Sequence, residues 1–176
     1  NLKFLVTVRK NLVLLGMMGV GKSTLGKIVA KKQDLKFIDT DFNIEKKFSM
    51  KISEIFKKRG EEFFRIHEKK EVLKALEKRE CVISLGGGAF MNKIVRDKIL
   101  RNTISIWLDL NLKELNRRIS WNKKRPLINN NNIKFTIENL YAARKNIYKL
   151  ATYKINCNNM TKKNIVEKII YFYEKK

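Results

Sequence analysis

Residues 16–24 read Gly-Met-Met-Gly-Val-Gly-Lys-Ser-Thr and have the types and spacing of a phosphate-binding loop. In the pattern Gly-x-x-x-x-Gly-Lys-Ser/Thr, the glycines let backbone N–H groups surround phosphate oxygens. Lys22 of such a loop reaches the β- and γ-phosphates, and the Ser23 hydroxyl ligates Mg²⁺. We therefore predict a site for a nucleoside triphosphate with Mg²⁺. The expected nucleotide-binding residues of the loop are Gly19, Val20, Gly21, Lys22, Ser23 and Thr24.

The segments on either side of this loop support that interpretation. Residues 11–15 form an apolar run that predicts a buried strand, and residues 22–32 predict a helix. A helix N-terminus directs free N–H groups and a positive dipole end at a bound phosphate. An ordinary glycine-rich turn would not need this strand–loop–helix context.

Two carboxylates follow the next apolar run. Asp39 and Asp41 flank Thr40 at the end of a strand predicted over 36–39. Acids two residues apart at a strand end can face one crevice, so we expect Asp39 to hold a water on Mg²⁺ and Asp41 to face the phosphate acceptor. Helix capping by Thr40 or Asp41 is the alternative, and it would account for one acid but not both.

Three consecutive glycines, Gly86, Gly87 and Gly88, end a third apolar run at 81–85. Glycines there cost conformational entropy, so we expect a packing or ligand reason for them. Without side chains, the backbone can lie against a ligand and offer its N–H groups. A plain flexible turn is the alternative.

Two arginines lie on otherwise apolar helix faces and require anionic partners. Arg144 falls midway between Leu140 and Tyr148 at four-residue spacings, and its partner is either a structural carboxylate or a bound acidic substrate. Arg65 has the same two possibilities, because Glu61 and Glu68 lie within one helical turn of it. His67 is the sole histidine, and we interpret it as helix packing.

A polar segment at about 120–132 lacks periodicity and suits a mobile lid. Most of its lysines fit a solvated loop, but Arg125, followed by Pro126 and Leu127, could close over the transferred phosphate. The largely apolar run that ends in Asp109, residues 104–109, resembles the second metal motif of many ATPases. Asn111 and Glu114, however, have the spacing of a capping box, so we interpret Asp109 as structural.

Short apolar runs alternate with helical patterns along the whole chain, which predicts a parallel sheet covered on both faces. Ligands of such sheets bind beyond the carboxyl ends of the strands. Those ends coincide with the residues described above. The expected strands are 11–15, 36–39, 81–85, 103–108 and 151–156, and the expected helices are 22–32, 42–48, 53–59, 61–79, 91–100, 111–119, 133–150 and 161–174.

The chain has one proline and contains no linker, internal repeat or long apolar run. We therefore expect a single domain over residues 1–176. We expect no membrane span, and residues 1–10 lack the features of a signal peptide. Cys81 and Cys157 have no metal-type spacing, so we expect reduced, buried thiols in a cytoplasmic protein.

The net charge of +23 would suit a nucleic-acid partner, but the lysines recur on nearly every predicted surface rather than in one patch. Lys, Asn and Ile are all encoded by A/T-rich codons, so an A/T-rich genome is sufficient to explain the excess of lysine. We therefore expect no nucleic-acid partner, although the charge should attract anionic substrates.

Together these segments resemble shikimate kinase, a family of small P-loop kinases of aromatic amino-acid biosynthesis. The resemblance covers nearly the whole chain and implies transfer of the ATP γ-phosphoryl group to the 3-hydroxyl of shikimate. It also implies a three-layer α/β fold with five parallel strands in the order 2-3-1-4-5, helices on both faces and a mobile lid. The motifs that carry it are residues 16–24, 39–41, 52–56, 60–61, 64–65, 86–88, 125–127 and 144–148.

The resemblance also implies roles for individual residues. Arg65 and Arg144 would bind the shikimate carboxylate, and the backbone of 86–88 would lie beside the ring. Asp41 would bind the ring hydroxyls as candidate base. The remaining implied contacts are Arg125 with the phosphates and Arg118 with adenine, which makes Lys22, Asp41 and Arg125 the expected catalytic residues. The expected partners are ATP and shikimate, with Mg²⁺ as cofactor, and we expect a monomer.

The sequence departs from the family pattern at two places, and two other classes of protein are alternatives to this family. Asn156 stands where the family commonly has an acid, and the lid carries four asparagines at 129–132. A gluconate-type kinase would share the P-loop and lid but would not need two arginines that converge on a carboxylate. A nucleic-acid-binding ATPase would use the net charge directly and would predict steeply salt-dependent binding.

Overall fold

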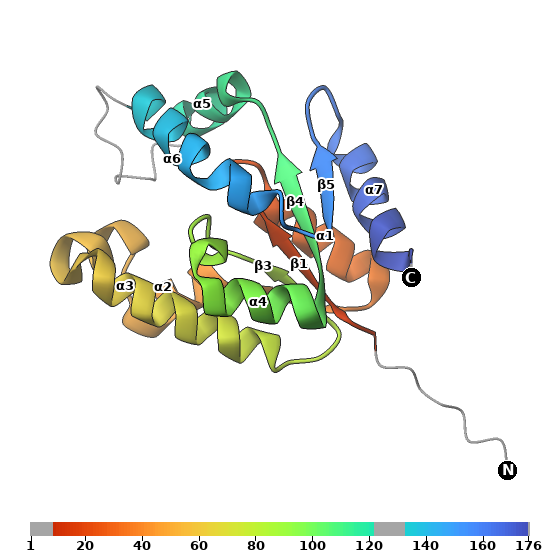
Figure 1. The fold of residues 1–176 in the computed structure, drawn as a ribbon, viewed down its shortest axis with the longest axis horizontal. Helices are drawn as coiled ribbons and strands as arrows, with labels where there is room; N and C mark the ends of the chain where they lie inside the picture. The colour runs from red at the N-terminus through yellow and green to blue at the C-terminus, as the bar shows by residue number, and fades with distance from the viewer. Residues whose placement is uncertain (1–8, 122–132, 176) are drawn as a thin grey trace, which may run out of the picture.

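The computed structural model describes residues 9–121 and 133–175 and has a parallel sheet at its centre (Figure 1). The sheet order β2-β3-β1-β4-β5 confirms the expected order, and each pair of neighbouring strands is parallel. The expected strands are confirmed with small shifts at their ends. They are β1 (Asn11–Leu15), β2 (Lys36–Asp39), β3 (Cys81–Ser84), β4 (Thr103–Asp109) and β5 (Tyr153–Asn156).

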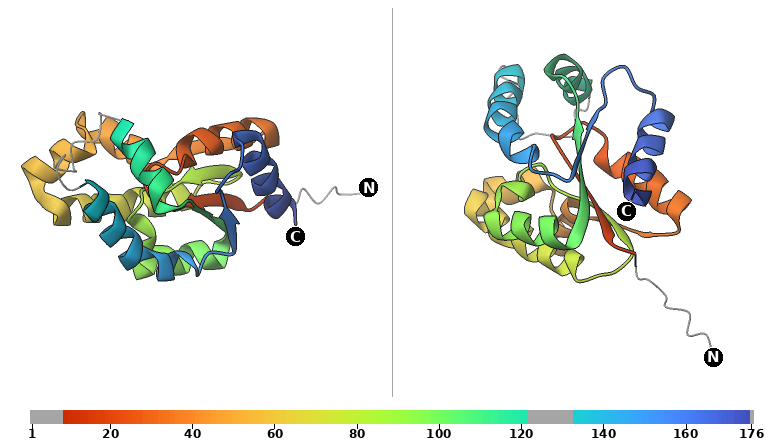
Figure 2. Two further views of the ribbon diagram at one scale, coloured as in Figure 1. Left: turned by 90° about the horizontal axis from the view of Figure 1, so that it is seen from above. Right: turned by 45° about the vertical axis from the view of Figure 1, so that its right-hand side comes forward.

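Helices cover both faces of the sheet. Figure 2 shows α1 and α7 side by side on one face and α4 on the other. The described helices are α1 (Lys22–Gln33), α2 (Thr40–Phe48), α3 (Ile52–Leu76), the 3₁₀ turn η1 (Ala89–Met91), α4 (Lys93–Asn102), α5 (Leu112–Trp121), α6 (Ile133–Tyr148) and α7 (Lys162–Glu174).

The central strands form the core. Every residue of β1 and of β3 is buried, which explains their unalternating apolar sequences. A second, smaller cluster joins α2 to α3 through the buried side chains of Ile44, Ile55 and Phe64. The α2–α3 pair is therefore a separately packed unit beside the sheet, at the edge formed by β2.

Gly60 interrupts α3. Its φ of 84° and ψ of 166° are not helical, and no atom lies within 4 Å of the place where a Cβ would stand. Glycine adopts this backbone conformation without steric cost. The expected helices 53–59 and 61–79 are therefore the two halves of one element that bends at Gly60.

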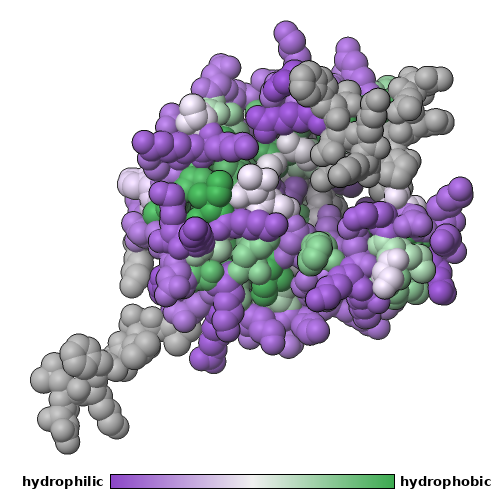
Figure 3. Space-filling view, turned by 180° about the vertical axis from the view of Figure 1, so that it is seen from behind, coloured by the Kyte–Doolittle hydropathy of each residue, from purple (hydrophilic) through white to green (hydrophobic). Residues whose placement is uncertain are grey.

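The surface of the described residues is mostly hydrophilic on one face (Figure 3). On the face in Figure 3, hydrophilic residues cover most of the surface and surround small hydrophobic patches. Among the described helices, none combines the length and the hydropathy that crossing a membrane would need. Arg125 and most of the expected lid lie outside the described residues.

Candidate active site

The phosphate-binding loop between β1 and α1 is shaped by glycines at positive φ. Gly16, Gly19 and Gly21 have φ values of 139°, 82° and 105°. A Cβ on Gly16 would also lie 2.5 Å from the backbone oxygen of Leu108 on β4. Glycine is therefore required at this position both for backbone conformation and for close packing against the neighbouring strand.

Lys22 is held over this loop by the loop's own carbonyl groups. Its Nζ donates to the backbone oxygens of Gly16 at 2.9 Å and Met17 at 3.0 Å, and its side chain is largely buried. The ammonium therefore already occupies the concave side of the loop, where a phosphate would be surrounded by backbone N–H groups.

Asp39 joins the loop to the end of β2. Its Oδ2 accepts a hydrogen bond from Ser23 Oγ, and its Oδ1 accepts one from the backbone N–H of Phe42 at 3.1 Å. Asp39 is therefore the N-cap of α2, and the alternative that Thr40 or Asp41 caps this helix is wrong. The helix begins at Thr40, two residues earlier than expected, because the acceptor that ends the strand also starts the helix.

Thr40 fixes the first turn of α2 to the glycine segment. Its Oγ1 donates to the backbone oxygen of Ser84 and accepts from the N–H of Gly86, both at 3.2 Å. Thr40 is fully buried. The carboxyl ends of β2 and β3 are thereby held together, which places Asp41 beside the glycines.

Each of the three glycines makes room for a different charged group. A Cβ on Gly86 would collide with Asp41 and would lie 2.8 Å from Oε1 of Glu68. One on Gly87 would lie 3.1 Å from Nη1 of Arg144, and one on Gly88 would collide with the guanidinium of Arg65. The packing reason expected for these glycines is therefore present, and the plain flexible turn is not. The charged groups that face the glycine backbone are those of Asp41, Arg65, Glu68 and Arg144.

Arg65 on α3 is held by two carboxylates. Its Nη1 donates to Oε2 of Glu68 at 2.7 Å, and its Nε and Nη2 donate to Oε1 of Glu61 at 3.1 Å. Burial lowers the pKa of Arg65, but Glu68 and Glu61 outweigh that effect and the pKa stands above its ordinary value. The guanidinium is therefore firmly charged and oriented, and one third of its side chain is exposed.

Glu68 is the buried acid of the site. Only 4% of the residue is exposed, and burial raises the pKa of its carboxyl above the ordinary value, opposed mainly by Arg65 and then by Arg144. Arg65 is therefore the ion-pair partner of this buried carboxyl, and the charge of Arg144 also acts on it. The sequence suggested Glu68 only as a pairing partner of Arg65, through the spacing of three residues on a helix.

Arg144 and Tyr148 of α6 lie behind the glycines. Both are buried, and the Tyr148 hydroxyl donates to the backbone oxygen of Gly87. Burial raises the pKa of Tyr148 to about 12, so the hydroxyl keeps its proton. This bond ties α6 to the glycine segment, where a Cβ on Gly87 would meet Nη1 of Arg144.

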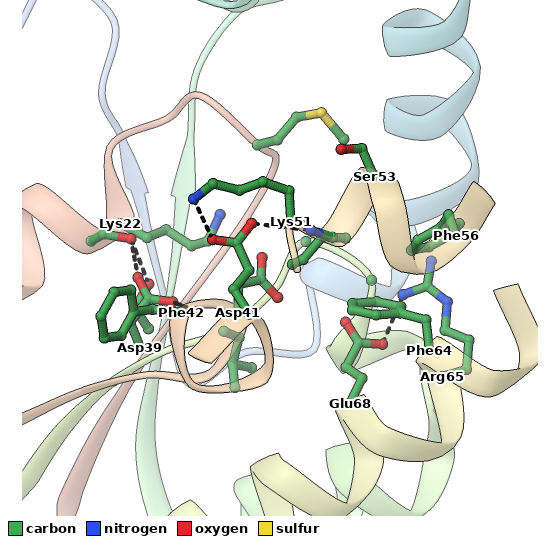
Figure 4. Close-up of a pocket in the computed structure, with 18 of the residues that line it drawn as sticks. Lys22, Asp39, Asp41, Phe42, Lys51, Ser53, Phe56, Phe64, Arg65 and Glu68 are labelled. Atoms are coloured by element: carbon green, nitrogen blue, oxygen red, sulfur yellow. Dashed lines mark hydrogen bonds and ion pairs between the residues drawn. The ribbon is translucent and has the colours of Figure 1, made fainter. Parts of the chain in front are cut away.

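These groups share one pocket of about 430 Å³, shown in Figure 4. Figure 4 shows Lys22 of the loop at one end of the pocket and Arg65 and Glu68 of α3 at the other. Among the described residues, the lining is Met18, Lys22, Ser23, Asp39, Asp41, Phe42, Glu45, Lys51, Ile52, Ser53, Phe56, Phe64, Arg65, Glu68, Ser84, Leu85, Gly87, Gly88 and Arg144.

Some predicted site residues lie elsewhere. Arg118 is not part of this lining; its Nη1 donates to the backbone oxygen of Val20 at 3.3 Å and its Nε to Glu114 at 2.9 Å. Asp109 accepts from the Tyr141 hydroxyl at 3.1 Å and pairs with Lys154 at 2.9 Å, which confirms its structural interpretation.

The structural role assigned to His67 is also confirmed. Its ring packs against those of Phe48 and Phe63, with centroids 4.8 and 4.5 Å apart. No sequence motif, by contrast, indicated that Phe42, Glu45 and Lys51 line the pocket. Their positions follow from the packing of α2 against α3, which brings residues distant from the phosphate-binding loop to its acceptor side.

A glycine-rich phosphate loop between β1 and α1, in a parallel sheet of order 2-3-1-4-5, defines a P-loop kinase of the small-molecule type. The fold alone extends to a gluconokinase from Sinorhizobium meliloti, with a TM-score of 0.59 at 15% identity. The family model for shikimate kinase, however, matches residues 18–174, and the chain belongs to that family.

Shikimate kinases from several bacteria are similar to this protein over nearly the whole chain. A shikimate kinase from Sulfurihydrogenibium is 40% identical over 161 residues, which is 92% of this chain and 96% of that protein. One from Bacillus subtilis is 39% identical over 173 residues, covering 97% and 92%. The solved shikimate kinase from Acinetobacter baumannii in complex with shikimate has a TM-score of 0.88 at 29% identity and covers 96% of each chain. These likenesses favour a shikimate kinase over a gluconate-type kinase.

Proposed function

We propose that this pocket binds ATP and shikimate together and transfers the γ-phosphoryl group to the 3-hydroxyl of shikimate, releasing ADP and shikimate 3-phosphate. The observation that carries the proposal is the placement of Asp41, Arg65 and Arg144 in the same pocket as Lys22 and Ser23. Membership of the family supports the choice of acceptor.

The acceptor would be held by its carboxylate. Arg65 and Arg144 face consecutive glycines and both act on Glu68, so a small carboxylate has two guanidinium groups within reach. Charge-assisted bonds of this kind are strong and directional. Gly87 and Gly88 leave the space that these two guanidinium groups occupy.

Asp41 would orient the attacking hydroxyl. It lies at the start of α2 beside Gly86, and Figure 4 shows it between Lys22 and Arg65. A loose phosphoryl-transfer transition state needs alignment and charge neutralisation more than a strong base. Asp41 would therefore serve chiefly to hold the hydroxyl in line.

On the donor side, Lys22 would exchange its two carbonyl partners for phosphate oxygens. Ser23 and Asp39 offer hard oxygen atoms of the kind that Mg²⁺ prefers, and Mg²⁺ commonly takes few protein ligands beside phosphates. Among the described residues no group of three acidic, cysteine or histidine side chains could hold a metal ion. When bound, the ion would neutralise phosphate charge.

We assign Arg125 of the expected lid to the transferred phosphate, as the family resemblance implies, and Arg118 to the nucleotide side.

An assay of ADP release tests this function. We expect shikimate to stimulate turnover strongly, and gluconate and nucleic acid to leave it unchanged. A rate that does not respond to shikimate would overturn the proposal. Stimulation by DNA or RNA would instead support an ATPase that uses the net charge. We further propose that the protein acts as a monomer.

A further inference from the structure

Lys51, at the N-cap of α3, lines the acceptor pocket, and the mechanism above gives it no task. Figure 4 shows its side chain extended away from α3 along the pocket, where its Nζ lies 3.0 Å from Oε2 of Glu45. Lys51 is therefore a cation in the same pocket as Lys22, Arg65 and Arg144.

Helix formation does not explain a lysine here. N-cap side chains normally accept a hydrogen bond from the first turn, which an ammonium cannot do. The free N–H groups are bonded by neighbouring acids instead: Glu54 accepts from the N–H of Lys51 at 2.9 Å, and Glu45 accepts from the N–H of Ile52 at 3.1 Å. A cation at this end of a helix also opposes the helix dipole.

The ion pair that holds the ammonium is easily replaced. The Lys51 side chain is 71% exposed, and that of Glu45 is 25% exposed. Such pairs contribute little to stability, because water screens them and two long side chains must be ordered. A more highly charged anion in the pocket can therefore take the ammonium from Glu45.

We propose that Lys51 binds the phosphate of the phosphorylated acceptor, so that this protein holds its product more tightly than its substrate. This inference rests on the proposed function. Phosphorylation adds roughly one and a half to two negative charges to the acceptor. Lys22 serves the nucleotide, and Arg65 and Arg144 serve the carboxylate. Among the described cations of the pocket, Lys51 is then the one available to the new phosphate.

Calorimetric titration of the full chain with shikimate and with shikimate 3-phosphate, each in the presence of MgADP, tests the inference. Lys51→Ser should raise the Kd of shikimate 3-phosphate about tenfold, since it removes one charge-assisted contact. The Kd of shikimate should change by less than about twofold, because its carboxylate stays with the arginines. Serine is a preferred N-cap, so the melting temperature should hold or rise.

Two further variants sharpen the test. Glu45→Gln removes the competing carboxylate and should lower the Kd of shikimate 3-phosphate. Lys58→Ser removes the same charge from an exposed lysine of α3 that pairs with Glu54 at 3.8 Å and does not line the pocket. It should leave both Kd values unchanged, because its charge faces solvent and is screened.

The outcomes separate the two proposals. If wild type binds both ligands and Lys51→Ser changes neither Kd, or changes both equally, the inference about Lys51 is wrong and the proposed function stands. Equal effects of Lys51→Ser and Lys58→Ser would likewise overturn it, because the net charge alone would then be responsible. If wild type binds neither ligand, both proposals fail.

Discussion

Gly88 and Arg65 occupy adjoining space so closely that a Cβ on Gly88 would overlap the Arg65 guanidinium. The two residues are far apart in the chain, on the segment after β3 and on α3. Gly88 has a φ of −97° and a ψ of −14°, which any residue can adopt. Glycine is therefore needed here for the space that the arginine takes, and backbone conformation is not the reason.

Gly88→Ala should weaken acceptor binding while the fold persists. The methyl group would displace the guanidinium of Arg65, and the KM for shikimate should rise about tenfold or more with the loss of a charge-assisted contact. Since the backbone is already in an ordinary region, the free energy of unfolding should change by less than about 1 kcal/mol. Steady-state kinetics and urea unfolding measure the two effects.

Gly60→Ala is the contrasting variant. Gly60 has a φ of 84° and open space around it, so a methyl group there meets backbone strain and no neighbour. Unfolding free energy should fall by about 1–3 kcal/mol, with the KM for shikimate little changed. If Gly88→Ala instead lost stability and kept its KM, the close approach to Arg65 would have no role in binding.

Acidic residues at strand ends and arginines on apolar stripes were predictable from the sequence because their signals are local. Asp39 and Asp41 follow a short apolar run, and Arg144 interrupts a helical stripe. Their neighbours in the chain were enough to indicate a common crevice. The strand order, by contrast, came from the family resemblance.

Long-range packing determines the features of the site that local sequence signals did not predict. Lys51 enters the pocket because Ile44 of α2 packs on Ile55 and Phe64 of α3, a contact that no short motif encodes. Glu68 of α3 is buried beside Gly86 of a distant segment, and the charges of Arg65 and of Arg144 on α6 both act on it. The start of α2 was misplaced by two residues because Asp39, which ends β2, also caps the helix.

Asp41→Asn should act mainly on turnover. The amide can still occupy the space beside Gly86 but cannot hold the attacking hydroxyl as an anion does. We expect kcat to fall by about 10² or more, within the range for a positioned acid–base group. Single-turnover measurements with saturating shikimate would report it. A kcat close to that of wild type would remove Asp41 from the reaction.

Arg144→Lys should act mainly on acceptor binding. Lysine keeps the charge but loses the planar pair of donors that matches a carboxylate. The KM for shikimate should rise about tenfold, with the KM for ATP within about twofold, because this contact lies on the acceptor side. Equal effects on both KM values would indicate a general disturbance of α6.

Glu68 should make stability depend on pH in a direction opposite to that of an ordinary paired acid. Its pKa is raised in the folded protein, chiefly by burial, so the folded state binds its proton more tightly than the unfolded state does. This contribution is fully present below the ordinary glutamate pKa and is lost as pH rises through the raised value. Wild type should lose stability relative to Glu68→Gln over that range.

Urea unfolding of both proteins at a series of pH values, starting below the ordinary glutamate pKa, measures this difference. The advantage of Glu68→Gln over wild type should grow with pH, because glutamine resembles the protonated acid at every pH. Parallel stability curves would show that the carboxyl titrates normally in the fold. A widening advantage of wild type would show that the two arginines lower the pKa of Glu68 instead.

Asp39 performs two tasks with two different oxygens, and Asp39→Asn should separate them. Oδ1 caps α2 through Phe42, and Oδ2 meets the Ser23 hydroxyl where Mg²⁺ is proposed to bind. Asparagine caps helices as well as aspartate does, so the melting temperature should stay within a few degrees of wild type.

The charge next to the metal is lost, so half-maximal activity should need about tenfold more Mg²⁺. Asp39→Ala should lose both properties, with a cost of about 1 kcal/mol for the missing cap. If Asp39→Asn kept the wild-type Mg²⁺ requirement, Asp39 would be a helix cap alone, and the magnesium site would need another acid.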